Sequence, residues 1–368
     1  MFRHVRAVPT GPGTPHPSLR ATFSLWEKEV GRIAMTNISQ TFRTGLNPYG
    51  LTYHLGLQGR DTARANPKGA GLEGFIAIAT ELKAKVLEIF DPWLAAMTDD
   101  QLKALKDRLA ALGMTPVISA GLNMMGPVES ALRSAAALDA KVIRLGLSPV
   151  LEGSRGAWGA KWFELDASIR AGLATYAPMA HDQGRVLAIE NHQDFTSAEL
   201  VAFCQAYGPG LGICFDTGNT FPVGEAPIDF ARCIVAHVAH VHLKDYRVQF
   251  TDEGYKLVRC AIGDGAVPIK DIAALVSQHH PAMNAVLEPG ALEARHIRFL
   301  NPGWWSGYQP MQARDFAAAL AAARKNRLPD DADTRTPWER GADHELPQYE
   351  LAMIRRSAAN MRALGLTT

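Results

Sequence analysis

Eight short apolar runs, each followed by a longer amphipathic segment, dominate the sequence from about residue 50 onward. Continuous apolar runs of this length are typical of strands that are buried on both faces of a sheet. The runs lie at residues 50–55, 85–90, 115–119, 142–145, 186–190, 211–216, 238–243 and 285–288. The amphipathic segments, which predict helices, lie at residues 72–82, 98–112, 127–138, 163–183, 197–207, 228–236, 268–278 and 312–325.

This alternation predicts a parallel sheet, because right-handed strand–helix–strand crossovers place successive strands side by side. Eight such units can close into a barrel. Doubly wound sheets rarely contain eight regular units, and no Gly-x-Gly-x-x-Gly motif follows the first apolar run. We therefore expect an α/β fold, a (β/α)8 TIM barrel over residues 35–326.

The two ends of the chain differ from this pattern. Residues 1–34 are rich in Pro, Gly and Arg, and their first acidic residue is Glu27. We expect a disordered N-terminal extension or a translation start at Met35, with a transit peptide as the alternative. Residues 327–368 begin with a polar stretch and then predict one helix from Leu346 to Leu364. This C-terminal helical extension is expected to pack on the barrel or on a neighbouring subunit.

The composition limits the classes of partner and the compartment. The formal net charge is +1 and no run of Lys or Arg stands out, which disfavours binding to nucleic acid or to a membrane surface. No apolar stretch approaches the ~18 residues of a membrane span. The four cysteines form no Cys-x-x-Cys pair, so a reducing, cytoplasmic setting is expected; they are Cys204, Cys214, Cys233 and Cys260.

Charged or ligating residues lie at or near the ends of six of the apolar runs. Barrel enzymes place their catalytic groups at the C-terminal ends of the strands. A carboxylate buried there is costly unless a cation compensates its charge. The last four of these six residues are Glu, Asp, His and Glu on consecutive strands. We therefore predict that these four bind one divalent metal ion, with separate salt bridges as the alternative. The six residues are Glu88, Arg144, Glu190, Asp216, His242 and Glu288.

The predicted ligand set favours a hard metal ion. Three carboxylates and one imidazole suit Mn²⁺, Mg²⁺ or Co²⁺ better than a thiolate-bound metal.

Four segments resemble the xylose-isomerase-like superfamily of sugar isomerases and epimerases. They are Glu-Asn-His at residues 190–192, Phe-Asp-Thr-Gly-Asn at 215–219, Val-His-Leu-Lys-Asp at 241–245 and Leu-Glu-Pro-Gly at 287–290. The Gly-Asp-Gly at 263–265 resembles that family's Gly-acid-Gly loop, and the similarity covers about residues 50–325.

This resemblance implies a ligand set and a chemistry. The residues matching Glu190, Asp216, His242 and Glu288 bind a divalent ion in the family, commonly manganese. In its ketose epimerases the two Glu positions also exchange protons with the substrate. The resemblance therefore implies that Glu190 and Glu288 abstract or return a proton beside a carbonyl.

Two departures from the family narrow the choice of relatives. Ketose 3-epimerases and abasic-site endonucleases carry a His three residues after the strand-six Asp, and this chain has Asn219. The endonucleases also need a His from strand three, where this chain reads Ile-Ser-Ala-Gly at 118–121. A DNA-repair role is therefore disfavoured, and a ketose 3-epimerase identity is weakened.

Several further residues are candidates for roles in the site. His192 is a second candidate base or a cap of the following segment. We expect Lys244 either to contact substrate or to pair with Asp245. Arg144 and Arg259 are expected either to neutralise an anionic group or to form structural ion pairs. Trp304 and Trp305 cover a sugar or form a subunit contact. The full set of predicted substrate contacts is His54, Glu88, Arg144, Lys244, Arg259, Trp304 and Trp305.

Three functional hypotheses follow from these residues. The first is a metal-dependent isomerase or epimerase that acts on a keto sugar or related polyol through an enediolate. The second is a lyase that decarboxylates an oxo-sugar acid or eliminates from a 3-oxo-glycoside. The latter is the reaction of C-glycoside deglycosidases, whose metal-bearing subunit resembles this superfamily and works with a small β-rich partner. The third is a non-catalytic sugar-binding barrel. A homo-oligomer is expected.

Overall fold

A computed structural model describes residues 42–122 and 126–367 of the chain. The extension predicted over residues 1–34 lies outside these residues. Among the helices of the described residues, none combines the length and the apolar character needed to cross a membrane.

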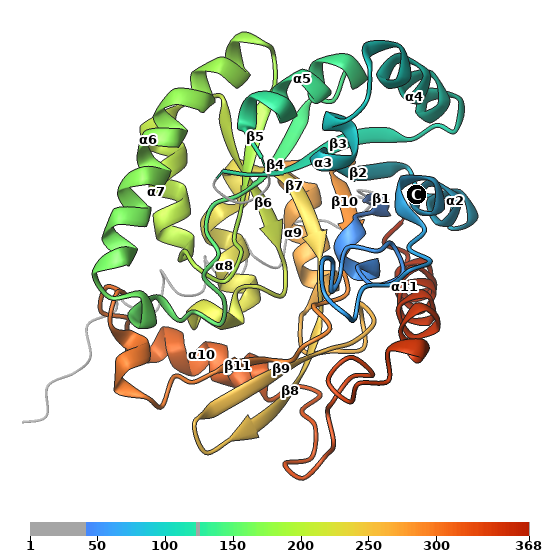
Figure 1. Cartoon of the computed structure of the whole chain (residues 1–368). Helices are drawn as coiled ribbons and strands as arrows, with labels where there is room; N and C mark the ends of the chain where they lie inside the picture. Colours follow the sequence, from blue (N-terminus) through green and yellow to red (C-terminus); the bar gives the residue numbers. More distant parts are fainter. Residues whose placement is uncertain (1–41, 123–125, 368) are drawn as a thin grey trace, which may run out of the picture. The chain divides into compact units, whose positions relative to one another are not determined.

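Eight parallel strands close into a barrel (Figure 1). Around the barrel they follow the order β1-β10-β7-β6-β5-β4-β3-β2, and β1 completes the ring by pairing with both β2 and β10. The predicted TIM barrel is therefore confirmed. The strands are β1 (Arg43–Leu46), β2 (Val86–Phe90), β3 (Thr115–Gly121), β4 (Val142–Gly146), β5 (Val186–Glu190), β6 (Leu211–Asp216), β7 (Val238–Leu243) and β10 (Asn284–Leu287).

Helices lie on the outside of the barrel (Figure 1). Two of them begin at Thr98 and Thr196, whose side chains form capping boxes with the third residue of the helix and satisfy backbone N–H groups there. The helices are α2 (Gly71–Glu81), α3 (Asp91–Ala95), α4 (Asp99–Ala111), α5 (Val128–Leu138), α6 (Ala160–Asp182), α7 (Ser197–Tyr207), α8 (Pro227–Ile234), α9 (Ile269–His279) and α10 (Ala313–Ala323).

The prediction of the first strand at residues 50–55 is wrong. This run begins inside a short 3-10 helix, Pro48–Leu51, which Asn47 caps, and continues as turns. The true first strand, Arg43–Leu46, reads Arg-Thr-Gly-Leu and therefore contains no apolar run. A Cβ at Gly45 would collide with the backbone carbonyl of Val86 on β2, so only glycine lets the two strands approach.

A small antiparallel sheet, which was not predicted, follows the barrel strands. Its strands are β8 (Tyr246–Thr251), β9 (Gly254–Arg259) and β11 (Arg295–Ile297), in the order β11-β9-β8. The β8–β9 hairpin begins three residues after β7 ends, and β11 follows β10 in the chain. This sheet therefore extends from the C-terminal ends of two barrel strands.

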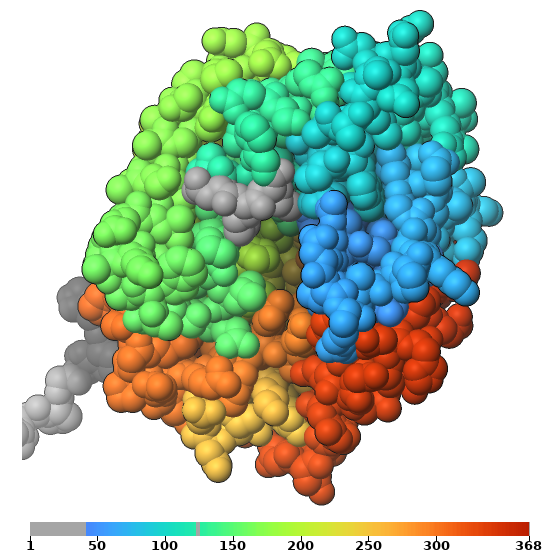
Figure 2. All heavy atoms as spheres, viewed as in Figure 1, coloured from blue at the N-terminus to red at the C-terminus, as the bar shows by residue number. Residues whose placement is uncertain are grey.

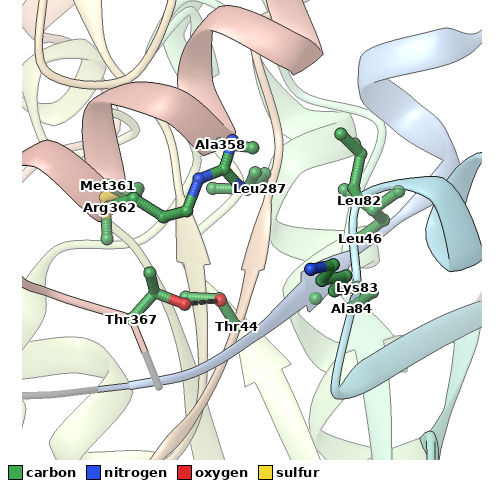
Figure 3. Close-up of a pocket in the computed structure, with 11 residues that line it drawn as sticks. Thr44, Leu46, Leu82, Lys83, Ala84, Leu287, Ala358, Met361, Arg362 and Thr367 are labelled. Carbon is green, nitrogen blue, oxygen red and sulfur yellow. Dashed lines mark hydrogen bonds between the residues drawn. The ribbon is translucent and has the colours of Figure 1, made fainter.

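The C-terminal extension forms the helix α11 (Leu346–Ala363), as predicted. Its Glu350 accepts backbone N–H groups of Tyr53 and His54 at 3.1 and 2.7 Å. At its end, Thr367 hydrogen bonds to Thr44 beside a pocket of about 200 Å³ (Figure 3). The described residues that line this pocket include no carboxylate, so it is not a candidate metal site.

Candidate metal centre and active site

The four predicted metal ligands lie together at the C-terminal ends of consecutive barrel strands. Glu190 and Asp216 are the last residues of β5 and β6, His242 is in β7, and Glu288 directly follows β10. All four are buried, and one ligand atom from each lies within 4.8 Å of the others. The barrel therefore brings together three carboxylates and an imidazole that are separated by up to 98 residues in the sequence (288 minus 190).

The orientation of the His242 ring suits metal ligation. Its Nε2 lies 2.7 Å from Glu88 Oε2, and its Nδ1 lies 2.8 Å from Glu288 Oε2 and 3.4 Å from Glu190 Oε1. If Nε2 donates its proton to Glu88, the lone pair of Nδ1 faces two carboxylates. A carboxylate that holds the second ring nitrogen is a recurrent partner of metal-binding histidines. The geometry thus leaves a place for a cation between Nδ1 and the carboxylates.

The electrostatics of the cluster also fit a cation. Burial, followed by Glu288 and Glu190, raises the pKa of Asp216 to about 7 although the Lys244 ammonium opposes this. Within the described part of the chain, both Glu190 carboxylate oxygens and His242 Nδ1 are buried without an aligned hydrogen-bond partner. Oxygen-rich sets of this kind suit hard divalent ions such as Mn²⁺ or Mg²⁺. The residues present therefore fit a divalent ion.

Asn219 occupies the position where some relatives carry a histidine, and here it positions Asp216. Its Nδ2 donates to Asp216 Oδ2 at 2.9 Å, and its backbone N–H donates to Oδ1 at 3.1 Å. The side chain of Asn191 exchanges two hydrogen bonds with the backbone of Asp216. The ends of β5 and β6 are thus held in one geometry.

A cavity of about 260 Å³ opens beside the ligands, and Figure 2 shows the face of the molecule that is hollowed near its centre. Two of the candidate metal ligands, Glu190 and Glu288, line the cavity, so both can contact a substrate. Its other described lining residues are Tyr49, Thr52, Gln58, Arg144, Gly146, His192, Gln193, Lys244, Tyr246, Ala291, Leu292, Glu293 and Arg295.

Arg144 and Lys244, which were predicted to contact substrate, line the cavity. Both also form ion pairs with carboxylates of the candidate metal ligands. Arg144 Nη2 lies 3.0 Å from Glu190 Oε2. Lys244 Nζ lies 2.5 Å from Asp216 Oδ2 and 2.6 Å from Glu288 Oε1. The predicted alternative, a Lys244–Asp245 pair, does not form.

Asp245 instead holds the Gly-acid-Gly loop. Its carboxylate accepts backbone N–H groups from Gly263, Gly265 and Val267. This loop does not belong to the described lining of the cavity.

His192, the second candidate base, lies in the cavity wall. Burial lowers its pKa to about 4, so its ring is neutral at neutral pH and can accept a proton. It does not cap the following helix, because Thr196 performs that role.

Three residues that were predicted to contact substrate have other partners in the fold. Glu88 lies behind His242 and accepts from the Nε2 atoms of His242 and His240, at 2.7 and 3.0 Å. His54 follows the 3-10 helix and not a strand, and Glu350 binds its backbone. Arg259 stacks on Tyr349 and donates to the carbonyl of Gly50. None of these three residues belongs to the described lining of the cavity.

The two tryptophans join loops and do not reach the cavity. The indole N–H of Trp304 donates to the Glu152 carbonyl at 2.8 Å, and its ring stacks on Tyr308. The indole N–H of Trp305 donates to the Phe299 carbonyl at 2.7 Å. Neither ring is part of the cavity wall that the described residues form, and their role as a sugar cover stays a prediction.

Residues that were not predicted also contribute to the site. Asn47 donates to Glu288, and the ring of Tyr49 lies under Arg144. Tyr246 and Arg295 line the cavity from the small sheet. The Asn-Pro pair at 47–48, a helix-start signal, could have indicated the first two; the three-residue strand of Arg295 has too weak a signal.

Comparisons with known proteins agree with the barrel fold. Residues 76–300, more than half of the chain, match the family model described as xylose isomerase-like TIM barrel. The chain is 26% identical over 178 residues to "Uncharacterized protein YihM" of Escherichia coli (strain K12), a match that covers 48% of this chain and 52% of that protein. The chain thus spans about half the length of that relative.

Two further matches cover more of their partners. The chain is 22% identical over 245 residues to 3-oxo-isoapionate decarboxylase of Pectobacterium atrosepticum, covering 65% of this chain and 86% of that protein. A crystal structure of D-psicose 3-epimerase in the presence of D-fructose superposes with a TM-score of 0.52 at 17% identity, covering 88% and 99% of the two chains. The latter likeness supports the fold alone, whereas the family match identifies the chain: it belongs to the xylose isomerase-like TIM barrel family.

Proposed function

We propose that this chain is a divalent-metal-dependent enzyme that moves a proton beside the carbonyl of a small keto sugar or related polyol, as an isomerase or epimerase. The observation that supports this most is that Glu190 and Glu288 both belong to the buried ligand cluster and both line the cavity. A pure binding module has no need to bury three carboxylates together, because their desolvation is costly.

The side chains of the cavity divide the work as follows. When bound, a divalent ion polarises a carbonyl and stabilises the negative charge that develops beside it. Glu190 and Glu288 are ionised: burial opposes this, but Arg144 and His242 lower the pKa of Glu190, and Lys244 and His242 lower that of Glu288. Each is therefore ready to accept a proton, with neutral His192 as the alternative base.

The size of the cavity supports a small substrate. Its volume of about 260 Å³ lies below the range of roughly 300–1,000 Å³ that is typical of drug-sized ligands. A monosaccharide therefore suits it better than a bulky glycoside, which weighs against elimination from a 3-oxo-glycoside.

Decarboxylation of an oxo-sugar acid is a second candidate. One relative, matched over 86% of its length, is a 3-oxo-isoapionate decarboxylase. Loss of CO₂ and loss of a proton beside a carbonyl leave the same kind of electron pair, which the same cation would stabilise. One site could therefore support either outcome.

Solvent exchange tests the proposal. The Mn²⁺-loaded protein is incubated in D₂O with a panel of pentuloses, hexuloses and 3-oxo-sugar acids, and deuterium at carbon and released CO₂ are measured. Deuterium uptake that chelation abolishes supports an isomerase or epimerase, and CO₂ release supports the lyase. If no compound in the panel gives either signal, both candidate functions are contradicted.

Two variants assign the bases. Glu190→Gln and Glu288→Gln should each lose at least ~100-fold in exchange rate, the lower end of a general-base contribution. Glu253→Gln, in the exposed turn of the β8–β9 hairpin, is the matched control. Metal content is measured for each variant, so that a lost base is distinguished from a lost metal. Wild-type rates in both site variants would move the base elsewhere, with His192 the first residue to test.

A further inference from the structure

Three cationic side chains line the cavity, and two of them are already paired. Arg144 lies 3.0 Å from Glu190, and Lys244 bridges Asp216 and Glu288. The side chain of Arg295, in contrast, has no hydrogen bond, ion pair or ring contact with any residue that the structure describes. Its positive charge is thus available to a ligand.

The guanidinium of Arg295 is partly withdrawn from solvent. Its Nε is buried and lacks an acceptor in the described parts of the chain. A charged donor that is buried without an acceptor is costly, so such atoms in native proteins call for an explanation. The neighbouring acid Glu293 also lines the cavity, but its Oε1 accepts from Gln58 Nε2 at 3.5 Å and it forms no ion pair with Arg295.

The small sheet fixes Arg295 beside the ligand cluster. Arg295 pairs with Leu257 as the first residue of β11. The ring of Tyr246, from β8, is held tightly, because a Cβ at Gly218 or Gly290 would lie only 2.9 or 2.6 Å from it. Lys244, Tyr246 and Arg295 all line the cavity. One small ligand in a cavity of about 260 Å³ can therefore contact both cations.

We propose that Arg295 binds an anionic group, a carboxylate or a phosphate, at one end of the substrate and so selects acidic sugars over neutral ones. This inference rests on the proposed function, because it places the other end of the sugar at Glu190 and Glu288. A guanidinium presents several N–H donors in a plane, a shape that matches either oxyanion. The Nε that has no acceptor in the protein would then donate to the ligand.

Calorimetric titration of inert ligands tests this inference without turnover. The Mn²⁺-loaded protein is titrated with ribitol, D-ribonate and ribitol 5-phosphate. The wild type should bind at least one of the two anions ~10-fold or more tightly than ribitol, as expected for a charge-assisted hydrogen bond. Which anion is favoured distinguishes a carboxylate from a phosphate.

Variants of Arg295 decide whether this residue is responsible. Arg295→Gln should bind the anions no more tightly than ribitol, with ribitol affinity unchanged within ~2-fold, and Arg295→Lys should restore part of the preference. Arg247→Gln removes a cation from β8 of the same sheet, at an exposed position outside the described cavity lining, and should behave as the wild type. Circular dichroism verifies that each variant is folded.

The outcomes separate the two proposals. If ribitol binds but the wild type shows no preference for either anion, the role of Arg295 is wrong while the sugar site stands. The same holds if folded Arg295→Gln keeps the preference. If none of the three ligands binds to the wild type, the sugar site itself is contradicted and the role of Arg295 falls with it.

Discussion

Glu88 is the residue that fixes how His242 faces the carboxylates. It accepts from the Nε2 atoms of both His242 and His240 in a fully buried position. Burial opposes its ionisation, but His242 and His240 lower its pKa below the usual value. An ionised Glu88 favours the tautomer in which His242 Nε2 carries the proton and Nδ1 is free to ligate.

Replacement of Glu88 should therefore weaken metal binding without removing a ligand. A Gln at this position is a weaker, neutral acceptor, and we expect Glu88→Gln to bind Mn²⁺ ~10–100-fold less tightly. Titration of the metal-free protein, followed by electron paramagnetic resonance of free Mn²⁺, measures the change. Glu81→Gln, which removes an exposed partner of Arg355, is the control. Wild-type affinity in Glu88→Gln would show that His242 keeps its orientation unaided.

Asp194 is a buried acid outside the ligand cluster. Its carboxylate accepts from Ser148 Oγ at 2.6 Å and from the backbone N–H of Phe195 at 2.9 Å. Burial raises its pKa to about 7, although Ser148 and Arg155 oppose the shift. Since the unfolded chain has an ordinary Asp pKa near ~3.9, the folded state holds this proton more tightly.

Stability should consequently fall as the pH rises through this window. Below pH ~4 Asp194 is protonated in both the folded and the unfolded state. Between pH ~4 and ~7 it must take up a proton on folding, which costs more as the pH rises. Above pH ~7 it is ionised in both states, and folding buries its charge. The loss is on the order of 4 kcal/mol in the free energy of unfolding. In Asp194→Asn the amide oxygen can accept from Phe195 N–H while Nδ2 donates to Ser148 Oγ, and this variant should show a smaller decrease between pH 4.5 and 7.5 in urea titrations. Parallel curves for the two proteins would contradict the raised pKa.

The sequence could predict those site residues that lie at the ends of strongly apolar strands. Glu190, Asp216 and His242 lie at or near the ends of clear apolar runs, so their position in the fold and their chemistry are read from the same pattern. Arg295 lies in a three-residue strand, and its importance depends on having no partner, which only the packing shows.

At the scale of elements, side-chain hydrogen bonds join two loops at the mouth of the barrel. The loop after β4 and the segment around residues 302–308 are joined by three contacts. Trp304 donates to the Glu152 carbonyl, Tyr308 donates to the Gly153 carbonyl, and Arg155 donates to the Gly307 carbonyl. A tryptophan in a loop is compatible with ligand stacking and with packing, and sequence alone does not separate the two.

Trp304 should therefore matter for stability and not for substrate affinity. We expect Trp304→Ala to lower the free energy of unfolding by ~3 kcal/mol or more, as for other buried Trp residues. The Michaelis constant should change less than ~2-fold, because the ring does not belong to the described cavity lining. Urea titration and steady-state kinetics measure the two effects. A large rise in the Michaelis constant with unchanged stability would return Trp304 to the role of a sugar cover.

The fold as a whole shows the same division between clear and weak signals. The seven barrel strands after β1 were predicted to within two residues, because each is an apolar run between helices. The first strand was misplaced because its four residues, Arg-Thr-Gly-Leu, contain no apolar run, and the contact with β2 demands the glycine at position 45. The β8–β9 hairpin was missed although apolar and polar residues alternate in Tyr-Arg-Val-Gln-Phe at 246–250, which is a signal for a strand.

At the scale of the whole molecule, the candidate metal centre ties four strands of the barrel to one point. The ligands come from β5, β6 and β7 and from the residue after β10, which are neighbours in the closed sheet. Burial raises the pKa of Asp216 there to about 7, and the neighbouring Glu288 and Glu190 add to this although Lys244 opposes it. Metal binding should therefore stabilise the entire barrel, because the ligands come together only in the folded state.

We accordingly expect Mn²⁺ to raise the midpoint of thermal unfolding. At a free concentration of ~100 times the dissociation constant, binding to the folded state adds about 2.7 kcal/mol, which corresponds to a rise of several degrees. Asp216→Ala should lose this shift, whereas Asp100→Ala, at an exposed position in the first turn of α4, should keep it in full. Scanning calorimetry with and without Mn²⁺ measures the midpoints. The shift should also shrink at pH 5, because a proton on Asp216, whose pKa is raised to about 7, competes with the metal. An undiminished shift in folded Asp216→Ala would place the bound Mn²⁺ outside the cluster at the strand ends.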